Sequence, residues 1–597
     1  MPVYSAPVDD TLFILNEVLA IEQYSGLPGF EDTSEDVVEA VLREGAKFVE
    51  EVLQPLNASG DEHGCIRNDD ASVTAPPGFK DAYLQFCEGG WLGLAQDPEF
   101  GGQGLPHVLS TAFEEYSAAA NMAFTMYPGL TQGAIAAIQA VGSQQQQAEL
   151  IPNMVKGRWT GTMNLTEPHC GTDLGLLRTK AEPQTDGSYK ITGTKIFISA
   201  GEHDLSENIV HLVLAKMTDS PDTIRGISLF IVPKILINED GSLGERNAVS
   251  CGAIEEKMGI HGNSTCVMNY DGATGYLIGE KEKGMRAMFI MMNAARLGVG
   301  MQGLAISEVA YQNAAAYARD RLQGRSLSGP KNADGAADPI IVHPDVRRML
   351  LNAKAFNEGA RALAMWVALL VDLSHSAPDE DARTNADDLV GLLTPVVKAF
   401  FTDKGYENAT NAQQCLGGHG YIREWGMEQF VRDARIAMIY EGTNGIQALD
   451  LVGRKLARNG GRALRSFSKT VADFVAEHSE DETLKPYTDA LAQAANDLES
   501  ATRWLMGNAL TNADNAGAAS VPYLNLMAYV ALGYVWSQMA VSATKALAKG
   551  TENESFYQNK LATADYFFSH MIAETALQRT RIEAGSKNLM ALDAAAF

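Results

Sequence analysis

Residues 438–447 read MIYEGTNGIQ and place one carboxylate, Glu441, beside two glycines in an apolar neighbourhood. Downstream, apolar side chains recur at near-helical spacing at Ile446, Leu449, Val452 and Leu456, which predicts that Glu441 lies where a loop enters a helix. Such a position holds a carboxylate rigidly and still lets it reach a pocket. The residues alone leave two interpretations open: Glu441 is a catalytic base, or it is an N-terminal helix carboxylate favoured by the backbone dipole.

Two neighbouring stretches bear on that choice. Residues 415–421 read CLGGHGY, and residues 432–435 read RDAR, which predicts a charged turn ahead of Glu441. The run YEGT at 440–443, followed by a helix and preceded by CLGGHGY, resembles the end of the catalytic domain of acyl-CoA dehydrogenases. These are FAD enzymes that introduce a 2,3 double bond into acyl-CoA thioesters. The resemblance implies that Glu441 is the catalytic base.

The composition is typical of a soluble globular protein. A chain of 597 residues is long for one hydrophobic core and predicts two to four domains. The net charge of -27 and the pI near 4.8 disfavour nucleic acid or an anionic membrane as the main partner. Any anionic ligand must therefore be met by local Arg, Lys or helix N-termini.

Three further features bear on location and metal content. The first ten residues, MPVYSAPVDD, have no basic segment ahead of an apolar run, so we expect a cytoplasmic protein without a secretory signal. The six cysteines show no C-x-x-C spacing, so we expect reduced thiols and no metal site. The most apolar late stretch, residues 521–543, fits a membrane span or a buried bundle helix, and we favour the buried helix.

The hydrophobic pattern changes twice along the chain and predicts an α+β multidomain fold. Residues 1–33 read as an N-terminal extension, 34–159 as an N-terminal helical domain, and 160–285, with β-branched runs between turns, as a middle β-barrel-like domain. Helical periodicity returns in a C-terminal helical bundle at 286–458. After a break at 459–461, an extra C-terminal helical domain is predicted at 462–597. Helix, sheet, helix is also the layout of the acyl-CoA dehydrogenase catalytic unit.

Residues 163–173, MNLTEPHCGTD, open the predicted β domain. A run with Pro and Gly exposes backbone donors that can bind the ring oxygens and nitrogens of a flavin, and a plain strand-to-turn passage with a capping Thr fits the residues too. The stretch resembles the family's TEP-x-x-G-[ST]-D segment, and KIFIS at 195–199 resembles its K-x-W-I-T. The resemblance implies FAD contacts from Met163, Leu165, Thr166, Gly171, Thr172, Phe197 and Ser199.

Family members bind the FAD pyrophosphate partly through the neighbouring subunit, with a Q-x-L-G-G turn and an Arg in an R-x-x-F-G segment. QCLGG at 414–418 fits the first, because a glycine pair lets backbone approach phosphate and a helix terminus can supply partial positive charge. The second is distorted at 320–325, where Arg321 is the candidate and Arg325 the alternative, ahead of a predicted loop insertion at 326–339. The implied contacts are Arg321, Gln414, Gly417, Gly418 and Thr443, and the shared site implies a homo-oligomer, with a dimer favoured.

The catalytic base of this family occupies either the position that Glu441 matches or one that Ala295 matches here, so only Glu441 can serve. The resemblance implies that Glu441 removes the pro-R α-proton of the thioester while a hydride leaves the β-carbon for flavin N5. The thioester oxygen is expected to be stabilised by the backbone N–H at Glu441 and a ribityl hydroxyl. Arg296 is expected to shape the base and the substrate site, to which Thr172 and Gly442 contribute.

The N-terminal extension and the extra helical domain resemble the roughly 600-residue bacterial subclass of the family. The expected substrate is a short acyl-CoA, 3-methylmercaptopropionyl-CoA of dimethylsulfoniopropionate degradation, converted to 3-methylthioacryloyl-CoA with an electron-transferring flavoprotein as acceptor. Alternatives are a straight-chain short- or medium-chain dehydrogenase and an acyl-CoA oxidase. An AidB-type DNA-associated flavoprotein, the alternative of another class, needs a basic C-terminal face, but residues 462–597 carry 11 Lys and Arg against 15 Asp and Glu, a net of -4.

Overall fold

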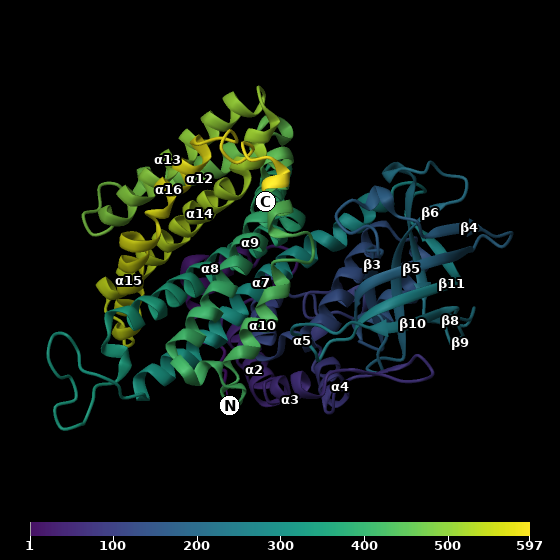
Figure 1. Cartoon of the computed structure of the whole chain (residues 1–597), viewed down its shortest axis with the longest axis horizontal. Coiled ribbons are helices and arrows are strands. Elements are labelled where there is room, and N and C mark those ends of the chain that lie inside the picture. The colour runs from purple at the N-terminus through teal and green to yellow at the C-terminus, as the bar shows by residue number, and fades with distance from the viewer. Residues whose placement is uncertain (1) are drawn as a thin grey trace. The chain divides into compact units, whose positions relative to one another are not determined.

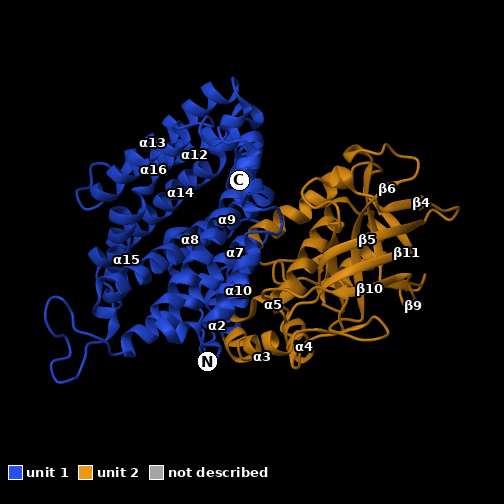
Figure 2. Ribbon diagram, viewed as in Figure 1, with its two compact units in different colours: residues 1–46, 106–119, 299–597 blue, residues 47–105, 120–298 orange. Residues whose placement is uncertain are grey.

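The computed structural model describes residues 2–597, which form two compact units (Figure 2). Unit 1 comprises the chain up to Ala46, residues 106–119 and residues 299–597, and unit 2 comprises residues 47–105 and 120–298. Three of the four crossings between the units fall inside helices: α2 (Glu35–Phe48), α5 (His107–Val141) and α7 (Gly284–Asp320). Helix α5 has extended backbone at Asn121, close to its crossing.

Unit 1 is helical (Figure 1). Apart from its share of the three crossing helices, it contains α1 (Val8–Leu12), α8 (Pro344–Ser376), α9 (Glu380–Cys415), α10 (Met427–Ala437), α11 (Asn444–Asp450), α12 (Arg462–His478), α13 (Lys485–Ala509), α14 (Ala513–Lys549), α15 (Glu554–Tyr566) and α16 (Glu574–Glu583). Helices α8 and α9 lie side by side, and α14 packs on both of them as well as on α13 and α16.

Unit 2 combines short helices with a sheet (Figure 1). Its own helices are α3 (Pro55–His63), α4 (Phe79–Glu88) and α6 (Gln144–Val155). Its strands are β1 (Ile66–Arg67), β2 (Val73–Thr74), β3 (Trp159–Asn164), β4 (Lys180–Pro183), β5 (Tyr189–Ser199), β6 (Asn208–Met217), β7 (Ile227–Pro233), β8 (Ile235–Ile237), β9 (Leu243–Arg246), β10 (Val249–Ile254) and β11 (Thr265–Ile278).

The main sheet of unit 2 closes on itself. Its strand order is β10-β11-β5-β4-β6-β3, and β7 pairs with both β11 and β6. The ring β11-β5-β4-β6-β7 therefore has no free edge, and closure removes the unpaired backbone groups that an open sheet would expose. The predicted β-barrel-like architecture is confirmed, and so is the α+β fold class.

Strands β6 and β7 are buried along their whole length, which explains why their sequences read as continuous apolar runs. Alternate residues of β6 enter two different hydrophobic cores. Val210, Leu212 and Leu214 join one that includes residues of α6 and α7, whereas Val213 and Ala215 join one with residues of β5, β10 and β11. The two faces of β6 therefore pack into two different cores, and neither face is exposed to solvent.

The apolar stretch at residues 521–543 lies inside α14. By length and composition alone, α14 and α7 could each cross a membrane, but 78% of the most apolar window of α14 is buried inside the protein. The expectation of a buried bundle helix holds for α14, because its apolar surface is already covered by neighbouring helices.

A cluster of buried charges ties the N-terminal extension to unit 1. The guanidinium of Arg361 on α8, which is 1% exposed, pairs with Glu115 of α5 at 2.6 Å, with Glu308 of α7 at 3.1 Å and with Asp10 of α1. Lys560 of α15 pairs with the same Asp10 and, at 2.7 Å, with Glu358 of α8. We call these residues the Arg361 cluster, and it joins helices that are distant in the sequence.

Two local expectations need correction or qualification. Residues 432–435 do not form a turn, because they lie in α10, where Arg432 pairs with Glu428 one turn earlier and Asp433 is buried. A helix can carry these charges because Glu and Arg four residues apart face each other. The break at 459–461 is present as three successive residues with positive φ. The five predicted domain ranges stay predictions.

Replacement of Arg361 by Met is expected to destabilise the protein strongly. Removing one partner of a buried ion cluster leaves carboxylates without compensation, which costs about 3–5 kcal/mol of unfolding free energy. The matched control is Arg43→Met, because Arg43 pairs with Asp9 and Glu39 at a site where its side chain is 52% exposed, and exposed pairs contribute about 0–1 kcal/mol. Thermal unfolding measures both; equal effects of the two substitutions would contradict a central role for the cluster.

Candidate functional site

Glu441 lies in a short connection between two helices of unit 1. Helix α10 ends at Ala437 and α11 begins at Asn444, with Thr443 as its N-cap, whose side chain accepts a hydrogen bond from the backbone N–H of Ile446. The prediction that Glu441 sits where a loop enters a helix is confirmed. Glu441 has φ +57° and Gly442 has φ +84°, so two successive residues adopt the left-handed conformation. For a glutamate this is uncommon and marks a backbone held by its surroundings.

The carbonyl groups of this turn point to two buried donors. The ammonium group of Lys398 on α9 donates to the carbonyl of Gly442 at 2.9 Å, and Lys398 is 0% exposed. The amide of Gln447, also buried, donates to the carbonyls of Glu441 at 3.1 Å and Gly442 at 3.2 Å. Glu441 and Gly442 are half-buried, and these buried donors satisfy their carbonyl groups.

Asn444 links the turn to α9. Its side-chain oxygen accepts from Lys398 at 2.8 Å, and its amide group donates to the hydroxyl of Thr402 at 2.9 Å and to the carboxylate of Asp403 at 2.7 Å. Burial raises the pKa of Asp403, and the hydrogen bond from Asn444 opposes that rise. The start of α11 is therefore anchored to two turns of α9 through one asparagine.

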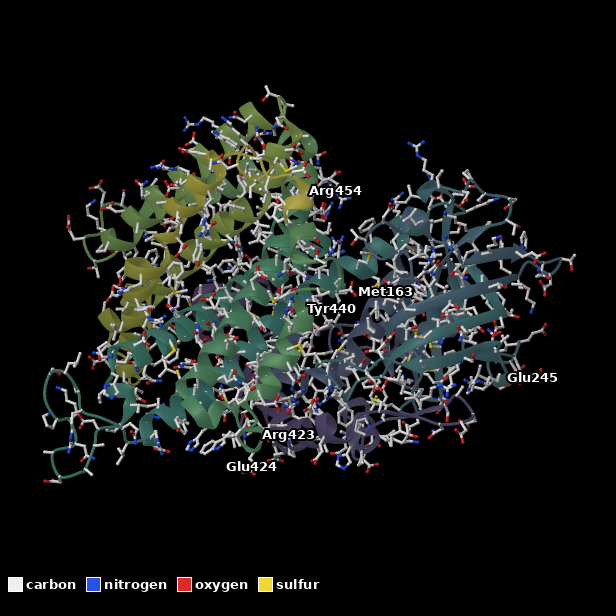
Figure 3. All side chains as sticks on the ribbon, in the orientation of Figure 1. Met163, Glu245, Arg423, Glu424, Tyr440 and Arg454 are labelled. Atoms are coloured by element: carbon white, nitrogen blue, oxygen red, sulfur yellow. The ribbon has the colours of Figure 1, made fainter. Side chains whose placement is uncertain are left out.

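Tyr440, labelled in Figure 3, directly precedes Glu441. Its hydroxyl donates to the side-chain oxygen of Gln302 on α7. Burial and then the nearby charge of Glu441 raise the pKa of Tyr440. The phenol therefore stays protonated at neutral pH and serves as a donor.

The predicted phosphate turn lies at the end of α9. Gln414, Gly417 and Gly418 are exposed, and a methyl group added at either glycine would meet no atom within 4 Å. That space suits close approach of a phosphate. The turn follows the C-terminal end of α9, where the helix dipole is negative, and Gly417 begins a short helix, Gly417–Tyr421. A phosphate at the turn would also need positive charge from side chains.

Arg321 is one side chain placed to supply that charge. The hydroxyl of Tyr317 on α7 lies 2.9 Å from Nδ1 of His419, in the short helix that begins at Gly417, and the ring of His419 stacks on Trp425. Arg321 follows Tyr317 by one helical turn, is exposed, and continues the helix through a backbone hydrogen bond to Tyr317. The structure thus brings the Arg321 segment and the Gly417-Gly418 turn into the same neighbourhood.

Arg325, the alternative candidate for the phosphate contact, forms its hydrogen bonds within its own loop. Its guanidinium donates to the carbonyls of Asn332 and Gly335 and pairs with Asp338 at 3.3 Å. Asp338 is buried and accepts hydrogen bonds from the backbone N–H groups of Ser326, Asn332 and Lys331, which hold its pKa at about 2. Asp338 therefore holds the inserted loop through its hydrogen bonds, and the guanidinium of Arg325 stabilises the same loop.

In unit 2, the segment after β3 is fastened to β5 by a buried ion pair. The ammonium of Lys195, 0% exposed, donates to the carbonyl of Leu165 and to the carboxylate of Glu167, both at 2.9 Å. Glu167 also accepts from the backbone N–H groups of Arg178 at 2.7 Å and Thr179 at 3.0 Å. Burial lowers the pKa of Lys195 to about 8, and Glu167 opposes that shift. The pair fixes the predicted flavin segments to each other.

Phe197 has an unusual conformation for an aromatic residue in a strand. Its φ is +59° and its side chain is 59% exposed. The register between β5 and β11 shifts there, so that Ile196 and Phe197 together oppose one residue of β11. Such a bulge turns a side chain out of the regular alternation. The bulge presents the exposed ring of Phe197 as a flat surface, and the contact of this ring with a flavin stays a prediction.

The remaining predicted residues of unit 2 lie on or just after β3, on β5, in the loop after Cys170 and on α7. Met163, labelled in Figure 3, is on β3, Thr166 accepts a backbone hydrogen bond from Ile196, and Ser199 ends β5. Gly171 and Thr172 are exposed in the loop that follows Cys170. Arg296 is 5% exposed on α7, where its guanidinium donates to Asn293 at 3.4 Å and lies 5.9 Å from the ring centre of Phe289.

Four residues that hold these segments escaped the sequence prediction: Lys398, Gln447, Lys195 and Glu167. A signal was present for Lys398, which stands alone among apolar residues in TPVVKAFF at 394–401. A lone lysine in an apolar helix must find acceptors. A cluster of possible metal ligands, Glu167, His169 and Cys170, lies within 4.8 Å, but the carboxylate of Glu167 is already occupied by the bonds described above.

Four family models match consecutive parts of the chain: "Acyl-CoA dehydrogenase, N-terminal domain" at residues 36–158, "Acyl-CoA dehydrogenase, middle domain" at 162–273, "Acyl-CoA dehydrogenase, C-terminal domain" at 282–456, and "Acetyl-CoA dehydrogenase C-terminal like" at 467–593. Together they span the helical, β and helical parts described above and the extra helical domain.

Relatives match over nearly the full length. The 3-methylmercaptopropionyl-CoA dehydrogenase of Ruegeria pomeroyi is 45% identical, with 97% of this chain and 98% of the relative covered. The broad-specificity linear acyl-CoA dehydrogenase FadE5 of Mycobacterium tuberculosis is 34% identical, with 100% of both chains covered. The structure of an acyl-CoA dehydrogenase complexed with FAD from Bacillus anthracis superposes with a TM-score of 0.73 at 21% identity, over 92% of this chain and 88% of that one.

Replacement of Phe197 by Gly is expected to raise stability. Left-handed backbone costs a residue with a Cβ about 1–2 kcal/mol, whereas the extra flexibility of Gly in the unfolded chain costs about 0.5–1 kcal/mol, so the net gain is about 0.5–1 kcal/mol. The matched control is Tyr276→Gly on β11, 41% exposed and without positive φ, which is expected to lower stability. Thermal unfolding of the two variants decides; a loss of stability in both would show that Phe197 is not strained.

Proposed function

The chain belongs to the acyl-CoA dehydrogenase family, an oxidoreductase family that acts on CH–CH groups, and from that premise we propose that Glu441 is the base that removes the α-proton of a short acyl-CoA thioester. We further propose that the preferred substrate is 3-methylmercaptopropionyl-CoA and the product 3-methylthioacryloyl-CoA. The 45% identity to the relative from Ruegeria pomeroyi supports that choice of substrate.

The observation that carries the proposal for the base is the turn that holds Glu441. A general base must be held at a fixed place relative to the proton it removes. The left-handed pair at Glu441 and Gly442, with both carbonyls bonded to buried donors, holds the backbone of this carboxylate. A carboxylate that served only as a helix N-cap would need no such support, and Thr443 already caps α11.

FAD is the cofactor that fits the residues of the two units. When bound, it supplies the acceptor for the hydride that leaves the β-carbon of the substrate. In unit 2, the exposed ring of Phe197 and the segment fixed by Lys195 and Glu167 offer a flat surface and backbone donors. In unit 1, the open Gly417-Gly418 turn and exposed Arg321 suit a pyrophosphate.

The chain's own residues then divide the work. Glu441 accepts the α-proton on its carboxylate, and the negative charge that develops on the thioester oxygen is met by backbone donors such as the N–H of Glu441. Arg296, Thr172 and Gly442 are the proposed substrate contacts. Met163, Leu165, Thr166, Gly171, Thr172 and Ser199 are the proposed contacts of the cofactor ring, and Gln414 and Thr443 are further proposed cofactor contacts.

The proposed partners follow from the same site. A homodimer would let Arg321 and the Gly417-Gly418 turn of one copy serve the cofactor of the other. An electron-transferring flavoprotein is the proposed acceptor, and a cytoplasmic location remains our expectation. Two alternatives stay in view: a straight-chain dehydrogenase, which the 34% identity to the broad-specificity linear enzyme supports, and an acyl-CoA oxidase. A DNA-associated role is disfavoured by the net charge of -4 in residues 462–597.

Anaerobic bleaching of the bound flavin by CoA thioesters tests the base and the substrate together. We expect 3-methylmercaptopropionyl-CoA to bleach faster than straight chains of three to eight carbons. In Glu441→Gln the rate should fall by about 10²- to 10⁴-fold, the range that general bases contribute. Stopped-flow absorbance measures each rate.

The outcomes separate the parts of the proposal. Faster bleaching by a straight chain would replace the substrate and keep the base, whereas an unchanged rate in Glu441→Gln would remove Glu441 from the mechanism. Rapid reoxidation of the reduced enzyme by oxygen, with no need for a flavoprotein acceptor, would favour the oxidase.

Replacement of Arg321 by Ala is expected to weaken FAD binding by about 10-fold or more, because a charge-assisted hydrogen bond to phosphate contributes about 1.5–3 kcal/mol. Arg325→Ala is the matched control, since Arg325 bonds within its own loop and should leave FAD affinity unchanged. Titration of the apoprotein with FAD, followed by flavin fluorescence, measures both. If Arg325→Ala alone lost affinity, the phosphate contact would belong to Arg325.

A further inference from the structure

We propose that Lys398 is a positioning residue for the reaction: its buried ammonium group holds the turn that carries Glu441 in the conformation that catalysis requires. The inference rests on the proposed role of Glu441 and goes beyond it, because Lys398 lies on another helix and bonds to the backbone of the residue that follows Glu441. Its placement inside α9 gives the turn an attachment to one of the longest helices of unit 1.

Two acceptors of the Lys398 ammonium group belong to the turn after Glu441. Lys398 donates to the carbonyl of Gly442 at 2.9 Å and to the side chain of Asn444 at 2.8 Å. These residues follow Glu441 by one and three positions, so the ammonium group forms hydrogen bonds with the chain immediately after the proposed base. A fully buried ammonium costs several kcal/mol unless its protons are satisfied, so moving the turn away would remove two of the acceptors of Lys398 at that cost.

The conformation that Lys398 holds is left-handed at Glu441 and Gly442. Left-handed backbone at Glu441 is costly for a residue with a Cβ, by about 1–2 kcal/mol, and an isolated chain would relax it. In the left-handed pair the carbonyl of Gly442 faces α9 and meets Lys398. If the bond to Lys398 is lost, the left-handed pair loses its direct bond from a side chain of α9 to the carbonyl of Gly442.

The neighbouring contacts support Lys398 and do not replace it. Asn444 is oriented by Thr402 and Asp403, which lie one turn beyond Lys398 on the same helix, so its oxygen faces the ammonium. Gln447 also donates to the carbonyls of Glu441 and Gly442, but it lies on α11 and moves with the turn. Of these donors to the two carbonyls, Lys398 is the one that belongs to α9.

The alternative is that Lys398 is only a structural lysine, and the chain offers a matched control. Lys560 is a second buried lysine of unit 1, 4% exposed, and it pairs with Asp10 and Glu358 in the Arg361 cluster. Lys560→Met removes a buried ammonium as Lys398→Met does, but it touches no residue of the turn. A purely structural role for both predicts equal consequences for the reaction.

The experiment compares Lys398→Met, Lys398→Arg, Asn444→Ser and Lys560→Met as FAD-loaded proteins. Hydrogen exchange of a peptide covering 438–447 reports the turn without reference to activity. We expect faster exchange there in Lys398→Met and Asn444→Ser, and no change in Lys560→Met. The limiting rate of flavin bleaching should fall by about 10- to 100-fold in Lys398→Met, with thioester affinity within about twofold of the parent, because a small displacement of a reacting group costs about that much.

Two outcomes support the proposal and three overturn it. Partial recovery of both exchange and rate in Lys398→Arg, which keeps the charge, supports it. So does non-additivity with Glu441→Asp, in which Lys398→Met costs less than in the parent because the base is already displaced. Unchanged exchange of 438–447, an equal rate loss in Lys560→Met, or full additivity with Glu441→Asp would each overturn it.

The result also separates this inference from the proposed function. If Glu441→Gln left bleaching intact, Glu441 would not be the base, yet the exchange data would still show whether Lys398 holds the turn. If Glu441→Gln abolished bleaching while Lys398→Met changed neither rate nor exchange, the base would stand and the positioning role would fall. Should Lys398→Met fail to fold, Asn444→Ser carries the same test, because it removes one acceptor of the ammonium and keeps the lysine.

Discussion

A buried ammonium group must be surrounded by acceptors, and the arrangement of the candidate site depends on that requirement. At Lys398 the acceptors are a main-chain carbonyl and an asparagine that both belong to the turn after Glu441. Because the buried charge is stable only when these acceptors stay in place, it restricts the conformation of the backbone. An apolar residue at the same place would leave the carbonyl of Gly442 without that donor.

A buried cation with fixed acceptors occurs at two other places. At each place it joins segments that are distant in the sequence. Lys195 on β5 holds Glu167 and the carbonyl of Leu165, which fixes the two predicted flavin segments of unit 2. Arg361 on α8 holds carboxylates from α1, α5 and α7. Hydrophobic burial is non-directional and tolerates small shifts, whereas a buried cation with fixed acceptors specifies one geometry.

The sequence predicted the fold class and the order of its parts because these follow from periodicity. The run at 438–447 located the loop-to-helix junction correctly, since a helix-favouring pattern and a glycine pair are local signals. The bonds of the two buried lysines were not predicted. Lys398 meets Gly442, and Lys195 meets Glu167, only through tertiary contacts. The error at 432–435 has a related cause: charged residues suggested a turn, but their spacing suited a helix face whose other side is buried.

The N-terminal extension and the extra C-terminal helical domain pack directly against each other. Besides the bond between Asp10 and Lys560, the carbonyl of Glu17 accepts from Ser542 at 2.9 Å, its carboxylate accepts from Tyr557 at 2.7 Å, and Phe13 packs edge-on against Phe556 at 5.5 Å.

Each contact joins the N-terminal extension to α14 or α15. Removing the extension would leave the buried ammonium of Lys560 without Asp10 and the ring of Phe556 without Phe13. The extension and the extra domain must therefore be kept or lost together. That coupling agrees with a relative that matches the chain over 100% of both sequences and not over its central part alone.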